Sequence, residues 1–259
     1  MTQFQEDQFN YTEHIQTNTL LNNQKLVSSH PEEMLFVIIH QVYELWFKQL
    51  IHDSGRTIAH LQKDELAQAT WLVQRMGRIL RVADTQLGVL EMLTFADFQE
   101  FRPFLEKSSG LQSRQFRDFE VLGGLAETAG EHYVTWAETL WPGIVASHPN
   151  TLHSTFVAAI GRSGTPLIDI YRNRWDQFQL FSLCEACLEM DRLMTTWRHN
   201  HIQMVKRMIG GQAQGTGGTF VEKYLEPTTK YKFFPELWDV RHEMTAASGG
   251  VVVSDQLPV

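Results

Sequence analysis

Disulfide pairs, membrane spans and an excess of positive charge are all missing from this sequence. Only two cysteines, Cys184 and Cys187, occur among the 259 residues, so no disulfide framework is available and a reducing, cytoplasmic compartment is expected. No apolar run reaches the ~18 residues of a membrane-spanning helix, and the first residues, MTQFQEDQFN, are too polar for a secretory signal. The formal net charge of -8 argues against a nucleic-acid partner, which requires a basic face.

Several motifs of metal and nucleotide chemistry are also absent. The chain has no H-E-x-x-H zinc motif, no Glu-x-x-His pair of the di-iron bundles and no C-x-x-C-H haem attachment site. The glycine-rich GTGG of residues 215–218 is not followed by Gly-Lys-Ser/Thr, so it is no P-loop. Cys184 and Cys187 have the spacing of a redox or zinc pair, but they fall within a helical pattern without a second pair, which favours plain packing.

Strand-type alternation is missing too, and helical periodicity takes its place almost throughout. Hydrophobic residues make up 43% of the chain, enough for a large apolar core that needs no disulfide or metal to stabilise it. The fold class predicted is therefore all-α, a single-domain helical bundle. We expect an N-terminal arm over residues 1–28, the bundle over 29–245 and a disordered tail over 246–259.

Start and stop signals divide the bundle into helices. A Ser-x-x-Glu capping box at Ser29 predicts a helix that runs to about His60, and apolar steps of three and four predict a second helix from about Asp64. Thr94 is expected to cap a short third helix. Residues 167–209 contain neither proline nor glycine and are too many for an average helix, so two helices or one bent helix are expected there.

Two histidines, His40 and His201, stand in apolar helical contexts. For each, the ordinary interpretation is a packed core histidine. The functional alternative for His201 is an imidazole ligand to a flat apolar cofactor, because neutral imidazole binds iron and an apolar wall suits haem. His199 lies about 200° away around the helix, so the HNH of residues 199–201 is no paired metal clamp.

Two pairs at i, i+4 spacing place polar chemistry beside aromatic rings. Phe36 and His40 share one helical face, and Phe98 and Arg102 share another. Arg102 is either an ordinary solvated arginine or a bidentate binder of a carboxylate, with Phe98 packing on the apolar part of that ligand. Thr216, within GTGG, belongs either to a plain linker or to a lid that touches the ligand.

Five segments together resemble the haem-dependent tryptophan 2,3-dioxygenase family. They occur in the order of that family and span about residues 10–242, and their joint occurrence is far more specific than any one of them. The segments are EEMLFVIIHQVYELWFK, VLEMLTFADFQEFRPFLEKSSGLQS, FSLCEACLEMDRLMTTWRHNHIQMVKRMIG, GTGGT and FFPELWDVR.

The resemblance implies a role for individual residues. His201 matches the proximal haem ligand, and His40 matches the distal histidine that contacts the indole N–H. Arg102 matches the arginine that binds the substrate carboxylate, with Phe98 beside it. The remaining matches are Phe36, which packs on the indole; Leu105, Ser109 and Gly110 in the loop near haem and substrate; Thr216 in the lid near the amino-acid head group; and Tyr11, His14 and Ile15, arm residues that wall the indole in a neighbouring subunit.

The resemblance also implies an all-helical homotetramer with a haem pocket between helices. The cofactor implied is haem b, iron protoporphyrin IX that is ferrous when active, with O2 as co-substrate. The oxidoreductase activity implied is dioxygenation of the indole C2=C3 bond of L-tryptophan or a substituted tryptophan, which gives N-formylkynurenine. The expected partners are therefore that small molecule and further copies of the chain, with no nucleic acid and no membrane.

Two departures from the family pattern keep alternatives open. His14 stands where the family usually has a second tyrosine, and the connection after Leu122, GGLAETAGEH, is short. The alternative within the enzyme class is a haem-dependent monooxygenase that converts a tryptophan derivative such as β-methyltryptophan to a 2-oxindole. From other classes, a non-catalytic haem-binding sensor would leave Arg102 and Thr216 idle, and a helical scaffold would bind no cofactor.

Overall fold

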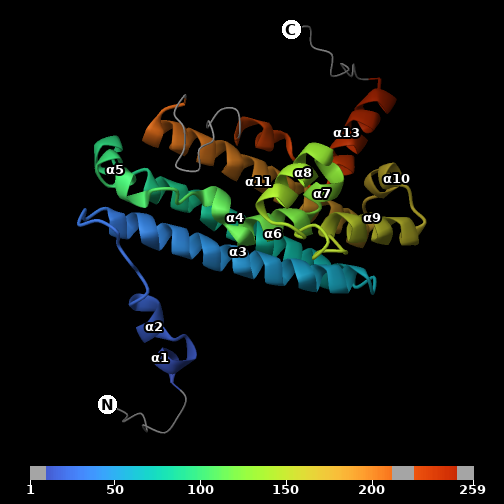
Figure 1. Cartoon of the computed structure of the whole chain (residues 1–259). Coiled ribbons are helices and arrows are strands. Elements are labelled where there is room, and N and C mark those ends of the chain that lie inside the picture. The colour runs from blue at the N-terminus through green and yellow to red at the C-terminus, as the bar shows by residue number, and fades with distance from the viewer. Residues whose placement is uncertain (1–9, 212–224, 250–259) are drawn as a thin grey trace.

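The computed structural model describes residues 10–211 and 225–249, and every regular element within them is a helix (Figure 1). The all-α prediction is confirmed. In this described part of the chain, no helix is long and apolar enough to span a bilayer. The helices, with short 3₁₀ turns labelled η, are α1 (Tyr11–His14), α2 (Thr17–Leu21), α3 (Glu33–Leu61), α4 (Leu66–Leu90), α5 (Phe95–Phe101), η1 (Arg102–Leu105), η2 (Gly110–Gln112), α6 (Arg114–Gly123), α7 (Leu125–Thr128), α8 (Glu131–Leu140), α9 (Leu152–Ser163), α10 (Leu167–Arg172), α11 (Phe178–Ile209), η3 (Glu226–Lys230) and α13 (Pro235–Ala247).

Three long helices, α3, α4 and α11, form the frame of the molecule. α3 and α4 make an antiparallel hairpin, and α4 packs against both α3 and α11 (Figure 1). Gly77 brings α11 close, because a Cβ at this position would lie 3.3 Å from the Leu193 side chain. The predicted apolar seam of α4 fills the interface and is buried at Ala69, Val73, Met76, Leu80, Ala83 and Leu87.

The predicted helix starts are partly right. Thr94 caps α5, since its side chain accepts a hydrogen bond from a backbone N–H of the first turn. The capping box predicted at Ser29 is wrong, because α3 begins at Glu33 without a side-chain cap. The carboxylate of Glu33 instead accepts hydrogen bonds from the backbone N–H groups of Val27 and Ser28, at 2.7 and 2.8 Å, and so holds the entering chain.

Residues 167–209 form two helices, α10 and α11, which decides between the two predicted arrangements. α11 buries Cys184 and Cys187 as free thiols. Burial raises the pKa of Cys184 to about 12 and that of Cys187 well above its ordinary value, so neither is a reactive thiolate at neutral pH. The packing interpretation of the C-E-A-C sequence is thus confirmed.

The two ends of the described chain differ in how they meet the frame. The helices α1 and α2 extend away from the other helices (Figure 1). Gln41 of α3 holds the base of this arm, because it accepts a hydrogen bond from Gln24 at 2.8 Å and donates one to the Asn23 carbonyl at 3.1 Å. At the other end α13 continues to Ala247, past the expected boundary at residue 245, and residues 250–259 lie outside the described residues.

A buried charge cluster joins α6, α8 and α11. Glu120 of α6 accepts hydrogen bonds from Arg117 and, at 2.7 Å, from Arg198 of α11. The Tyr133 hydroxyl of α8 donates to the same carboxylate at 3.3 Å. None of these four side chains is more than 6% exposed. Since one carboxylate faces two guanidinium groups, the cluster depends on it.

We expect Glu120→Ala to lower the free energy of unfolding by about 3–5 kcal/mol, because it leaves two buried guanidinium groups without a counter-charge. Urea unfolding followed by circular dichroism measures the loss. The matched control is Glu189→Ala, which removes a surface carboxylate that also contacts two arginines. The control should cost less than about 1 kcal/mol, and equal losses in the two variants would contradict the role given to Glu120.

Candidate functional site

The two candidate histidines lie on different helices at the same end of the frame. His40 is in the N-terminal half of α3 and His201 in the C-terminal part of α11. Because α3 and α11 run in opposite directions along α4, these two parts lie together (Figure 1). Their imidazoles interact across the intervening space, since a positive charge on His40 lowers the pKa of His201.

His201 presents a neutral imidazole. Its side chain is half-buried by area, and enough protein surrounds it that desolvation, followed by the charge of His40, lowers its pKa to about 4. The ring stacks on Trp197, one turn earlier in α11, with centroids 5.2 Å and planes 15° apart. No side chain or backbone group of the described residues makes a hydrogen bond to this imidazole.

A group of aromatic side chains, Tyr43, Phe47, Phe116 and Trp197, lies next to His201. The Trp197 indole is 6.1 Å from the Tyr43 ring, 6.5 Å from Phe47 and 5.3 Å from Phe116, measured between centroids. Sequence reasoning did not single out Trp197 and missed its contact with the histidine. The signal available was the i, i+4 spacing of Trp197 and His201, which puts both on one face of a helix.

His40 stands at the surface of α3, beside the ring of Phe36. Its Nδ1 lies 2.7 Å from the carbonyl oxygen of Phe36. Because a carbonyl oxygen only accepts, Nδ1 carries the proton and the neutral ring has its lone pair on Nε2. Solvent reaches the side chain, yet desolvation lowers its pKa more than the Phe36 carbonyl raises it. The neutral form of the His40 imidazole is therefore favoured.

The helix α5 brings the second predicted pair to the first. The Phe36 ring lies 4.2 Å from the His40 ring and 5.7 Å from the Phe98 ring, measured between centroids. Arg102 is the C-cap of α5, and its backbone N–H donates to the carbonyl of Phe98. Its side chain is half-buried. The structure therefore brings together Phe36, His40, Phe98 and Arg102 at the end of the frame where His201 lies.

The segment after α5 contributes the next predicted positions. Leu105, in η1, is partly buried against the core. Ser109 caps η2, since its hydroxyl accepts a hydrogen bond from the Leu111 N–H at 3.3 Å. Gly110 borders open space, because a Cβ added there would meet no atom within 4 Å.

Three predicted site residues are not brought to this place within one chain. Tyr11, His14 and Ile15 are exposed and lie on the arm that extends from the frame (Figure 1). Thr216 lies outside the described residues.

The donor set around His201 fits a haem. A neutral imidazole nitrogen is the form of histidine that ligates iron, and His201 stays neutral throughout the physiological pH range. The side chains that flank it on α11, Trp197 and Met204, are apolar and buried. In the described ranges, no three side chains of His, Cys, Asp or Glu are grouped to hold a bare metal ion. At the same end of the frame, His40 offers a nitrogen lone pair, Phe36 and Phe98 offer an apolar surface, and Arg102 follows Phe98 by one turn of α5.

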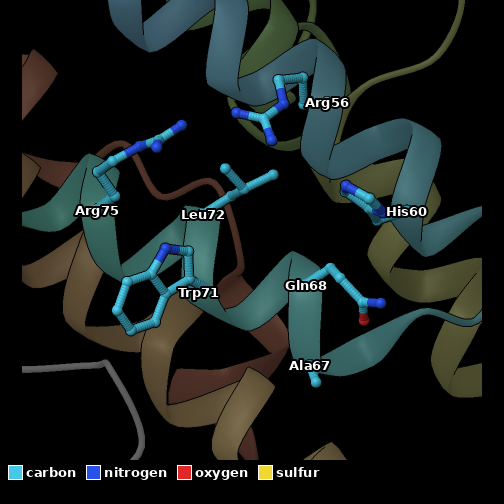
Figure 2. A pocket seen from close by; sticks show the side chains of 7 residues that line it. All are labelled: Arg56, His60, Ala67, Gln68, Trp71, Leu72 and Arg75. Atoms are coloured by element: carbon cyan, nitrogen blue, oxygen red, sulfur yellow. The ribbon is translucent and has the colours of Figure 1, made fainter.

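A separate hollow lies between α3 and α4 (Figure 2). Its lining is Arg56, His60, Ala67, Gln68, Trp71, Leu72 and Arg75. His60 is roughly 30 Å along α3 from His40, at about 1.5 Å of rise per residue. The cations of this hollow are already paired, because the buried Asp53 carboxylate contacts Arg75 and Arg56, and Glu65 lies 2.6 Å from His60. The hollow is therefore no part of the histidine site.

Comparison with known proteins gives one consistent result. The family model described as tryptophan 2,3-dioxygenase matches residues 1–140 and 152–244. The chain is 31% identical to the tryptophan 2,3-dioxygenase of Caulobacter vibrioides, over 90% of this chain and 98% of that protein. It is 35% identical to the proteins of the same name from Herpetosiphon aurantiacus, over 90% and 98%, and from a Nocardioides species, over 92% and 95%. With the family model matched over most of its length, the chain belongs to the tryptophan 2,3-dioxygenase family.

Proposed function

We propose that this chain is a haem-dependent oxygenase that inserts oxygen from O2 into the indole C2=C3 bond of L-tryptophan or a close derivative. Dioxygenation gives N-formylkynurenine. The observation that carries the proposal is the juxtaposition of two neutral imidazoles, those of His201 and His40, beside Phe36, Phe98 and Arg102. Haem b, when bound, supplies the iron that activates O2.

His201 is the residue that would hold the haem iron. Its imidazole is neutral, and no described residue competes for a ring nitrogen through a hydrogen bond. The apolar neighbours, Trp197 and Met204, favour a flat apolar ligand over a hydrated ion. Ser109 and Gly110, in the segment after α5, are proposed for the haem site on the basis of the sequence. Gly110 leaves open space where a side chain would otherwise stand.

His40 orients the indole. With its proton held on Nδ1 by the Phe36 carbonyl, Nε2 is left as an acceptor for the indole N–H. An obligatory base is not needed, because an indole N–H is a very weak acid and correct positioning alone contributes much of the rate. The Phe36 ring beside His40 gives the indole an apolar surface to pack on.

Arg102 binds the substrate carboxylate. A guanidinium offers two parallel N–H donors, which match the two oxygens of a carboxylate. Arg102 follows Phe98 by one turn at the end of α5, and in this proposal its charge and the apolar wall hold an aromatic amino acid at both ends. Leu105 extends that wall, and Thr216 is proposed for the ammonium side on the basis of the sequence.

A neighbouring copy of the chain completes the pocket in this proposal. Tyr11 is 73% exposed and Ile15 39% exposed, on an arm that extends from its own helical frame (Figure 1). Exposed apolar side chains on such an arm favour burial against another molecule. We propose a homotetramer in which Tyr11, His14 and Ile15 enclose the indole bound to the next subunit.

His201→Ala should abolish haem binding, because it removes the proposed axial ligand. The measurement is the Soret absorbance of purified protein after haem addition and gel filtration. His199→Ala is the matched control, since His199 is exposed and two residues away on the same helix, and it should keep the wild-type band. A wild-type Soret band in His201→Ala would contradict the ligand assignment.

Arg102→Lys should lower kcat/KM for L-tryptophan by about 10- to 100-fold, the factor expected for a lost charge-assisted bidentate contact. Tryptamine, which lacks the carboxylate, serves as the internal control, and the wild type and the variant should oxidise it at similar rates. Steady-state kinetics with both substrates measure the difference. Undiminished kcat/KM for L-tryptophan would rule out the carboxylate role.

The number of oxygen atoms transferred decides the reaction class. We expect the reduced, haem-loaded protein to add both atoms of isotopically labelled O2 to L-tryptophan, read by mass spectrometry. The departure at His14 is the observation that favours the other candidate, a monooxygenase that forms a 2-oxindole. A product with a single labelled atom, from L-tryptophan or from β-methyltryptophan, would establish that candidate. Haem binding without turnover of either substrate would leave the sensor function.

A further inference from the structure

We propose that Trp197 is a positioning residue that fixes the ring plane of His201 by stacking, in place of the hydrogen bond that usually orients a metal-binding histidine. The inference deepens the proposed function and rests on it, since it concerns His201 as the haem ligand. It assigns a role to the Trp197 indole, which has none in the proposed function.

The rings of Trp197 and His201 form a stacked pair. The two rings lie nearly parallel, 15° between planes, with centroids 5.2 Å apart. Both belong to α11 and are separated by one helical turn, so their backbones hold a constant relation. A nearly parallel stack opposes rotation of the imidazole about its Cβ–Cγ bond, because rotation would drive the ring edge into the indole face.

The indole itself cannot turn, because other helices enclose it. Tyr43 and Phe47 of α3 and Phe116 of α6 surround Trp197, the Phe47 ring standing at 88° to the indole. Trp197 is only 8% exposed. Burial raises the pKa of Tyr43 to about 12, and the nearby indole N–H offsets part of that rise, although the contact falls short of full hydrogen-bond geometry.

The described residues supply no counterpart to the hydrogen-bond acceptor that usually orients a metal-binding histidine. A histidine that ligates a metal normally donates its second ring N–H to a carboxylate, a carbonyl or water, and this bond sets the ring plane. The described residues place no carboxylate or carbonyl in hydrogen-bond contact with His201. Asn200, which precedes His201 in the chain, is engaged with Asp84 at 2.9 Å. Among the contacts of the described residues, stacking on the enclosed Trp197 indole is the one that acts on the imidazole ring.

The test compares haem-loaded wild type with Trp197→Leu. The readouts are the iron–histidine stretching band in the resonance Raman spectrum of the ferrous protein and the rate of haem transfer to an apomyoglobin scavenger. Trp197→Leu should broaden or shift the band and speed haem loss by about 10- to 100-fold, the usual cost of removing an orienting neighbour of a metal ligand. Trp197→Phe restores an aromatic face and should return both readouts to near the wild-type values.

Met190→Ala is the matched control, because Met190 is fully buried on the same helix and two turns away from Trp197. It reduces core packing and should leave the band and the haem-loss rate unchanged. Phe116→Leu, which loosens the enclosure of the indole but keeps Trp197, gives a milder variant with a smaller shift of the same sign. It keeps the proposal testable where Trp197→Leu fails to fold.

Two results overturn the positioning role alone: wild-type Raman and haem-loss values in Trp197→Leu, or an equal change in Met190→Ala. In either case wild type that binds haem and His201→Ala that does not would still support the ligand assignment. Haem retained by His201→Ala, or no haem bound by wild type, would instead overturn the proposed function and this inference with it.

Discussion

One turn of α4 fixes where His40 stands on α3, and the rest of the proposed site depends on how α3 and α11 attach to this turn. The hydroxyl of Tyr43 donates to the main-chain carbonyl of Ala83 at 2.7 Å. Gln86 donates to the carbonyl of Ile39 at 3.0 Å. These two contacts grip α3 on both sides of His40, inside an apolar interface where an unmade hydrogen bond would be costly. The helix α3, which carries His40, is therefore fixed against sliding or rotation relative to α4.

The same turn of α4 also attaches α11. Asp84 accepts a hydrogen bond at 2.9 Å from Asn200, the residue that precedes His201. Two turns earlier, the missing side chain of Gly77 lets Leu193 pack tightly and so sets the spacing of the two helices. The separation of the His40 and His201 imidazoles is thus set by the way α3 and α11 attach to α4. A pocket built on such a frame keeps its shape before any ligand enters, as preorganised binding requires.

The sequence could predict the frame better than the site. The seam of α4 and the cap at Thr94 follow from local rules, and both are present. The capping box predicted at Ser29 is absent because α3 begins only at Glu33, whose carboxylate instead accepts hydrogen bonds from the backbone N–H groups of Val27 and Ser28. The nearness of two histidines 161 positions apart depends on how α3 and α11 dock on α4, which no local pattern contains. Only resemblance to a family linked them.

The proposed site has two kinds of parts, the frame helices that carry His40 and His201 and the peripheral segments that carry Arg102 and His14. In the proposed function, His40 and His201 must keep a fixed separation, and the frame helices supply it through hydrogen-bonded contacts. Substrate choice would fall instead to groups at the end of the frame, such as Arg102, and to the arm that carries His14. A residue on a projecting arm can change without disturbing the packing of the frame, since it contributes little buried area to it. Under the proposed function, divergence of substrate or of oxygen stoichiometry is therefore expected at the arm first, and His14 on this arm is one of the two places where the sequence departs from the pattern of the family it resembles.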